Sequence, residues 1–295
     1  MSRKKKPNSR RPSSLPDGMY QVRHPHKPLA PLLAVLDDVC GRVREQVSAA
    51  GPAPVGYASF DRAILMRGLN LLEATRLLSE PLHWEVAATC ARQLYELVLN
   101  MEWLASMPDR ETASNQFALF GMLQQVRAKE AENDYARATG RTSDEEYASR
   151  LVEVLAREEF DQFRGKPRAD GSPKWATSWN GKTVWDMAKE SSNPIRKAQY
   201  NQLFVAWSEE AHGAPGALID SMFRVLAPDW HIDLLTNDLR EMSQIVSMAL
   251  FLFFELWMSL VNVPRMERDK WEAWLADIRA YVEANWRVSP AAHNP

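Results

Sequence analysis

The sequence predicts an all-α fold, a multi-helix bundle with long antiparallel helices and one irregular loop rich in Trp, Gly and Pro. From Leu29 onward, apolar residues recur at steps of three and four, the period of an amphipathic helix. No stretch alternates with period two for long enough to form a sheet strand. The 18 prolines concentrate in the first residues and between helical segments, where they end helices rather than interrupt them.

Helix boundaries in the first half follow from local signals. A first helix starts at Leu29 and ends at the stretch GPAPVG, residues 51–56. Ser59 is expected to cap a second helix that ends at Ser79, and Pro81 to start a third. A fourth helix follows Pro108-Asp109 and stops at Gly140. Ser143 with Glu146 forms a capping box for a fifth, ending near Arg164.

The second half contains the irregular loop, residues 165–182, which we expect Trp175 and Trp179 to pin to the body. Helical pattern resumes near Val184, and a helix then runs from Asn193-Pro194 to His212. After a boundary at Pro228-Asp229 come the longest apolar run, 245–263, and a Trp-rich helix, 270–286. Residues 29–288 are therefore expected to form one helical domain. Residues 1–28 and 289–295 are expected to be disordered.

The apolar run is long enough to cross a bilayer, but Glu255 lies near its middle. A charged residue at the centre of a span costs about 2.5–3.5 kcal/mol on the insertion scale, which was derived for Asp, Lys and Arg. We therefore expect a buried bundle helix and no transmembrane span. On a helical wheel the polar residues of this segment share one narrow stripe that either lines an internal polar site or faces water: Glu241, Gln244, Glu255, Ser259 and Asn262.

Charge is distributed unevenly along the chain. Six of its 36 basic residues lie in residues 1–16 with no acid, which leaves 30 against 38 acids and a net charge of −8 for the rest. An acidic body argues against broad nucleic-acid binding by the folded domain. The basic tail can contact RNA or anionic lipid, although a solvated leader is the simpler interpretation: Arg3, Lys4, Lys5, Lys6, Arg10 and Arg11.

No signal peptide is expected, because no apolar stretch follows the basic start. The only two cysteines, Cys40 and Cys90, fall in apolar helical patterns, which fits small buried side chains in a reducing, cytoplasmic compartment.

The third helix offers the first candidates for chemistry. Arg92 and Glu96 are four residues apart, beside Leu99 and Trp103, on the face opposite its apolar seam. They form either a surface pair or a buried site that needs partners.

His212 ends its helix just before Gly213, where a capping role explains it and a catalytic role is the alternative. Arg92 with His212 supplies the cation and base that metal-independent RNA cleavage needs, as in HEPN-type nucleases. Glu209 and His212 have the spacing of half a di-metal site, but the second half is missing, so no metal is expected. Nucleotide-binding and nucleophile-elbow motifs are absent, and no cofactor is expected.

Three segments together resemble an uncharacterised bacterial family, domain-of-unknown-function family 5677. They are CARQLYELVLNMEWL (90–104), WNGKTVWDMAKE (179–190) and YNQLFVAWSEEAHGAPGAL (200–218), and the resemblance spans residues 60–260. It implies an all-helical bacterial protein of a family that is sometimes linked to defence or toxin systems and has no established activity. Glu209-Glu210 departs from the apolar spacing that is commoner in the family. The residues that match are Arg92, Glu96, Trp179, Gly181, Lys182, Tyr200, Ser208, His212 and Gly213.

Two functions remain open at this point. The first is an interaction or regulatory protein, linked to defence, with a protein partner and a polar pocket. The second is a HEPN-like ribonuclease that uses His212 with Arg92 and Glu96. The residues expected in the pocket are Glu255, Tyr200, Ser208, Trp179 and Lys182. The partner is an unknown protein or RNA, and the sequence does not predict an oligomeric state.

Overall fold

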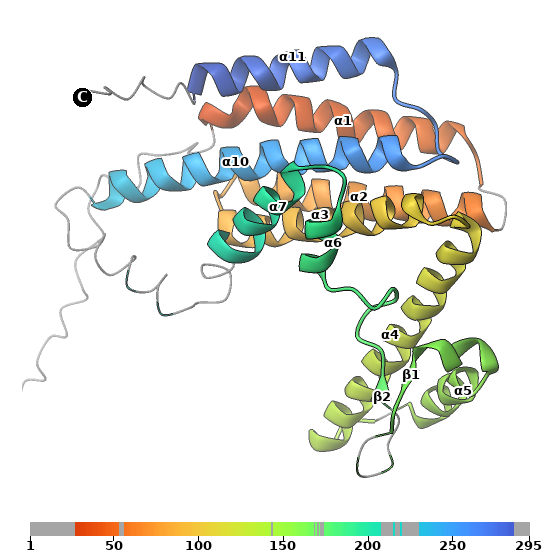
Figure 1. The fold of residues 1–295 in the computed structure, drawn as a ribbon. Helices are drawn as coiled ribbons and strands as arrows, with labels where there is room; N and C mark the ends of the chain where they lie inside the picture. The colour runs from red at the N-terminus through yellow and green to blue at the C-terminus, as the bar shows by residue number, and fades with distance from the viewer. Residues whose placement is uncertain are drawn as a thin grey trace, which may run out of the picture.

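The structure is a computed structural model, and it describes residues 27–52, 56–142, 144–167, 169, 171, 174–207, 215, 219 and 230–285. Most of this chain is helical (Figure 1). The longer helices are α1 (Ala30–Ala49), α2 (Tyr57–Ser79), α3 (Trp84–Ser106), α4 (Arg110–Ala138), α5 (Glu145–Leu155), α10 (Trp230–Ser259) and α11 (Arg268–Asn285).

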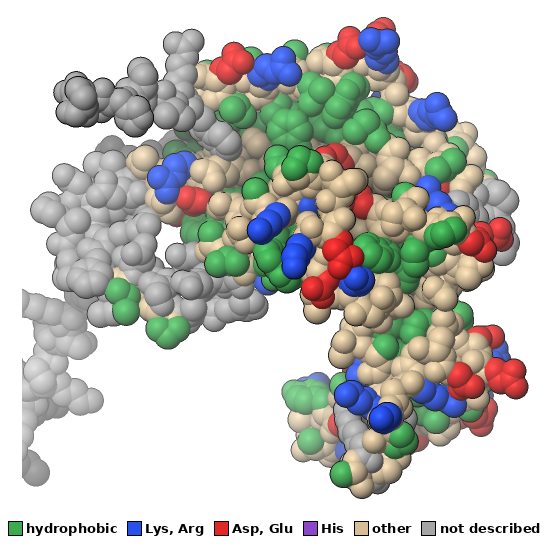
Figure 2. Space-filling model, in the orientation of Figure 1, with side chains coloured by type: hydrophobic (Ala, Val, Ile, Leu, Met, Phe, Trp, Pro, Cys, Tyr) green, Lys and Arg blue, Asp and Glu red, His purple; other side chains and the backbone are tan. Residues whose placement is uncertain are grey.

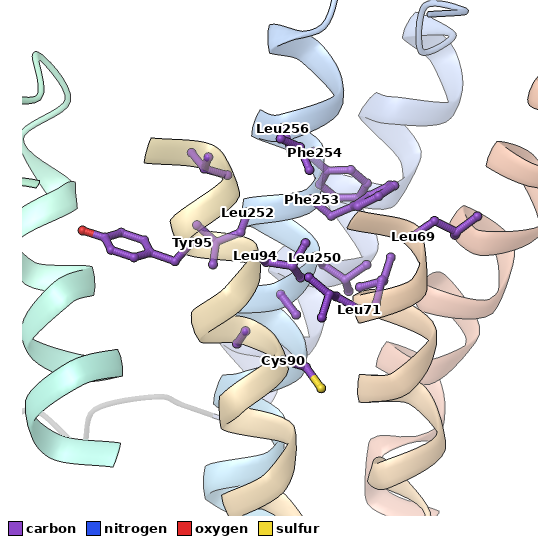
Figure 3. Close-up of a cluster of buried hydrophobic side chains, with 14 of the residues drawn as sticks. Leu69, Leu71, Cys90, Leu94, Tyr95, Leu250, Leu252, Phe253, Phe254 and Leu256 are labelled. Atoms are coloured by element: carbon purple, nitrogen blue, oxygen red, sulfur yellow. The ribbon is translucent and has the colours of Figure 1, made fainter. Parts of the chain in front are cut away.

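The body is a bundle of α1, α2, α3, α10 and α11, with α10 at its centre. The middle of α10 packs buried apolar side chains against α2 and α3, so these three helices share most of the core (Figure 3). Gly68 allows α2 to come close to α10, because a Cβ at this position would lie 2.6 Å from Cδ2 of Leu256. Large apolar burial of this kind is the main driving force for folding.

A lobe projects from the bundle, built on the second half of α4 (Figure 1). It contains α5, a 3₁₀ helix (Glu158–Phe163) and the short antiparallel pair β1 (Arg164–Gly165) and β2 (Lys174–Trp175). The lobe has apolar packing of its own, since Phe120 and Phe163 meet edge to face at 5.5 Å.

A chain of short helices returns from the lobe and lies across α3. It consists of α6 (Val184–Glu190), α7 (Ile195–Tyr200) and a π-helix (Asn201–Ala206). Thr183 and Asp186 form a capping box at the start of α6. π-helices are rare and occur frequently at functional sites. The segment Asn201–Ala206 is therefore a place to look for a functional role.

The all-α prediction is confirmed, and three predicted boundaries were wrong. Helix α2 begins at Tyr57 after Gly56 instead of being capped by Ser59. Helix α3 begins at Trp84 and not at Pro81, because Leu82 adopts a left-handed backbone (φ 59°) that no helix continues through.

Helix α5 stops at Leu155, well short of Arg164, and the chain tightens into the 3₁₀ helix. Its cap is Asp144, which accepts a hydrogen bond from the backbone N–H of Tyr147; the predicted cap Ser143 lies outside the described residues.

The long apolar helix is mostly interior. Within the described ranges one helix, Leu235–Ser259, is long and apolar enough to cross a membrane, and 67% of its most apolar window is buried in the bundle. A helix that is apolar on most of its sides must be covered, either by lipid or by other protein segments. In this structure the other helices of the bundle cover most of it, as expected for a core helix. Cys40 and Cys90 are both free and buried, as expected, and burial raises the pKa of each thiol.

Candidate functional site

A buried arginine joins three helices at the side of α10. Arg196, on α7, is only 1% exposed. Its Nε donates to Oε1 of Glu102 at 2.8 Å, and its Nη2 donates to the same oxygen. Its Nη1 donates to Oε2 of Glu255 at 2.7 Å and to Oε1 of Gln199 at 2.8 Å. One guanidinium therefore ties α7 to α3 and to α10 by charge-assisted hydrogen bonds.

The backbone around Arg196 is fixed as well. The Tyr95 hydroxyl donates to the carbonyl oxygen of Arg196 at 2.6 Å. Ser191 Oγ donates to Oε2 of Glu102 at 3.0 Å and accepts from the N–H of Asn193 at 3.1 Å. Tyr95 is buried, and burial raises the pKa of its phenol, which therefore remains a donor. Figure 3 shows Tyr95 pointing away from the leucine cluster.

An open groove of about 650 Å³ lies beside this cluster, between α7 with the π-helix, α10 and α11. Figure 2 shows hydrophobic side chains gathered in full view between α11 and α7. Most of the lining is apolar, and the volume is in the range of binding sites. The two walls supply Ile195, Ala198, Gln199, Gln202 and Trp207 on one side and Leu275, Ile278, Arg279 and Val282 on the other.

The floor of the groove is one stripe of α10. Every residue from Met242 to Trp257 is buried except Gln244, Met248, Phe251 and Glu255. These four follow one another at steps of four, three and four, so they lie on one face of the helix. Phe251 is 40% exposed although its neighbours Leu250 and Leu252 are fully buried. This stripe is the side of α10 that no described element covers.

Two charged groups of the groove have hydrogen-bonding atoms without a partner among the described residues. Glu255 uses Oε2 for Arg196, and its Oε1 makes no hydrogen bond within the described part of the chain. Arg279 is exposed on α11 and makes no ion pair with any described residue. The groove thus offers one acceptor and one cation at different places along an apolar floor.

A stack of rings and cations occupies the side of the π-helix that faces α3. The Arg92 guanidinium lies 4.0 Å from the centre of the Phe204 ring. Phe204 stacks on Tyr200 at 4.8 Å with an interplanar angle of 2°, and Tyr200 contacts Trp185 at 4.9 Å. Lys197 lies 5.8 Å from the Trp185 ring centre. The contacts are cation–π and aromatic, which makes the stack a packing element.

Arg92 and Glu96 do not form the surface ion pair that was one of the two alternatives, because Arg92 packs on Phe204 instead. Burial raises the pKa of Glu96, and the nearby charge of Arg92 only partly offsets this. His212, Ser208 and Glu209 lie outside the described residues. Convergence of Arg92, Glu96 and His212 therefore stays a prediction. Within the described ranges no group of three His, Cys, Asp or Glu side chains is placed to hold a metal ion.

The residues predicted for one polar pocket are spread over different places. Glu255 lines the groove, and Tyr200 belongs to the aromatic stack. Trp179 pins the irregular loop as expected, since its Nε1 donates to Oδ1 of Asn100 at 2.6 Å. Lys182 pairs with Glu190 at 2.7 Å and lies 5.3 Å from the Trp103 ring centre.

The polar stripe predicted on α10 is also divided. Gln244 and Glu255 line the groove, and Glu241 accepts a hydrogen bond from Nε1 of Trp207 at 3.0 Å. Ser259 and Asn262 bond locally and to α2, with Asn262 Nδ2 donating to Asp61 at 3.1 Å. Sequence reasoning missed Arg196, Glu102 and Gln199, the residues that hold the cluster together.

The ribonuclease hypothesis has a direct measurement. If Arg92 only packs on Phe204, bacteria expressing the protein should keep intact total RNA, and Arg92→Ala or His212→Ala should change neither RNA nor growth. RNA cleavage by the wild type that His212→Ala abolishes, with the helical circular dichroism unchanged, would establish the nuclease instead.

The fold and the groove define a class, namely an all-helical protein with an open, apolar groove next to a buried charge cluster. The sequence model of the Family of unknown function (DUF5677) matches residues 62–225, more than half of the chain. The protein belongs to this family. Glu102 and Arg196 lie inside the matched range, whereas Glu255 and α11 lie beyond it. Searches of curated proteins and of solved structures found no match.

Proposed function

We propose that this protein is an interaction protein that holds a segment of a protein partner in the groove between α7, α10 and α11. The observation that carries the proposal is the stripe of Gln244, Met248, Phe251 and Glu255, which is the uncovered part of an otherwise buried stretch of α10, residues 242–257. Soluble proteins rarely leave a large contiguous apolar surface open without a binding role.

The groove is preformed, which favours binding. Arg196 holds α7 against α3 and α10, and Trp207 is anchored to Glu241, so the wall opposite α11 is fixed. A rigid wall lowers the entropy that is lost when a partner docks. The buried cluster thus supports the groove rather than performing chemistry itself.

Site-specific photo-crosslinking tests this function. A photo-reactive amino acid at position 251 should crosslink a protein partner in the native host, and the same group at Leu77 should not. Leu77 is a matched control because it is an apolar side chain of α2 that is 75% exposed and does not line the groove. The crosslinked protein is then identified, purified and titrated against the full chain.

The titration decides the result. Phe251→Asp should weaken binding of that partner about tenfold or more, because it puts a charge in the centre of the apolar floor. Leu77→Asp should leave the affinity unchanged. Equal crosslinking from both positions, or equal affinities of the two variants, would show that the groove is not the docking site. A regulatory role, a link to bacterial defence and a cytoplasmic location stay predictions.

A further inference from the structure

We propose that the occupant of the groove is an amphipathic helix of a partner protein, with a basic and an acidic residue about two turns apart on its apolar face. This inference rests on the proposed function and adds the chemistry of the partner. It follows from the spacing of the floor residues, the concave shape of the groove and the positions of its two charges.

The floor has the spacing of a helix–helix seam. Steps of four, three and four from Gln244 to Glu255 are the pattern that a helix presents to a neighbouring helix. The other residues of α10 between Met242 and Trp257 are buried, and α10 packs there against described helices of this chain. The open stretch runs over twelve residues, and the eleven steps between its ends span about 16 Å of helix axis. Three turns of an incoming helix match this length.

The shape selects a convex occupant. The floor lies between a wall from α7 and the π-helix and a wall from α11, so the surface is concave. Two identical grooves facing each other would leave their floors apart, which disfavours pairing with a second copy through this face. A single helix that lays its apolar side chains on Met248 and Phe251 fills the groove.

The charges lie at separate levels of the groove. Helix α11 runs antiparallel to α10: Trp274 stacks on Phe254 near one end, and Tyr281 hydrogen-bonds Ser243 near the other. Arg279 therefore lies level with about residue 247, which is roughly 12 Å from Glu255 along the axis. Neither the Glu255 Oε1 nor the Arg279 side chain has an ionic partner among the described residues, and the two match a cation and an anion at that separation.

Helical peptides test the charge pattern on the full-length protein. The first peptide carries leucines on one face and, on that face, a lysine eight residues from a glutamate. The second has lysine at both places, and the third has glutamine at both. Binding is measured by fluorescence anisotropy at low salt, where exposed pairs contribute most.

The wild type should bind the lysine–glutamate peptide about three- to fivefold more tightly than either of the others, as expected for partly exposed ion pairs. Arg279→Glu should reverse this order and prefer the lysine–lysine peptide. Arg279 is exposed, so this variant should fold normally. Arg268→Glu on the same helix is the control for net charge, because Arg268 is 86% exposed and lies outside the groove.

The outcomes separate the two proposals. Equal binding of all three peptides that Phe251→Asp abolishes would overturn the charge pattern and leave the docking groove standing. No binding of any peptide, with a partner still crosslinked at position 251, would overturn the helical occupant alone. Dimerisation of the wild type that Phe251→Asp removes would overturn the partner helix in favour of a second copy.

Discussion

Arg196→Met should lower the free energy of unfolding by about 3 kcal/mol, one of the two largest effects that we expect of a single substitution in this protein. Methionine fills much of the space but leaves Glu102 and Glu255 without their shared cation. Breaking a buried ion pair from one side typically costs 3–5 kcal/mol. Both acids are about one third exposed, so water offsets part of the loss and we expect the lower end. Urea unfolding followed by circular dichroism measures the change.

Arg150→Met is the matched control. Arg150 also pairs with a glutamate, Glu146, but both side chains are at least 70% exposed. Such surface pairs contribute about 0–1 kcal/mol, so this variant should be nearly as stable as the wild type. Equal losses in the two variants would mean that the Arg196 cluster does not hold the helices together.

Asp61→Ala should cost about 3 kcal/mol as well, at the turn that follows the C-terminus of α10. Asp61 is fully buried on α2. Its Oδ2 accepts from the backbone N–H groups of Val261 and Asn262, at 3.1 and 2.9 Å, and from Nδ2 of Asn262. Arg110 lies 3.7 Å away. Alanine removes the acceptor and the charge together, and the turn after α10 loses its anchor.

Thermal unfolding of three proteins checks this expectation. Asp61→Asn keeps an acceptor oxygen and should lose only part of the stability. Asp277→Ala, at an exposed site on α11, should stay within about 0.5 kcal/mol of the wild type. An Asp61→Ala protein that melts with the wild type would rule out Asp61 as the anchor of this turn.

The periodicity of apolar residues was sufficient to predict the fold class and most helices. A buried helix face produces apolar residues at steps of three and four within one segment, so it can be recognised from that segment alone. Boundaries were predicted less well. The prediction that Pro81 starts α3 was wrong, because Leu82 takes a left-handed backbone and the helix begins at Trp84. Leucine rarely adopts a left-handed backbone, so the residue type gave no indication of this conformation.

The candidate site could be predicted only in part. Glu255 was found because a charge within an apolar run stands out. Arg196 was not found, since its stretch IRKAQY reads as an exposed helix and its partners Glu102 and Glu255 lie 94 and 59 residues away in sequence. A pair of Arg92 with Glu96 was one of the alternatives suggested by their local spacing, yet the Arg92 side chain packs on Phe204, which comes from a distant segment. Contacts between segments have no signature in local spacing.

The π-helix has a consequence for the directions in which the side chains around it point. Its wider turn changes the angle between successive side chains around the helix axis. Tyr200 and Phe204 therefore lie in the aromatic stack against α3. Gln202 and Trp207 line the groove. Rewinding this turn into an α-helix would rotate Trp207 against Tyr200 by about 100°, the angle of one residue. The π-helix therefore lets one short segment pack its rings on Arg92 of α3 on one side while it lines the groove on the other.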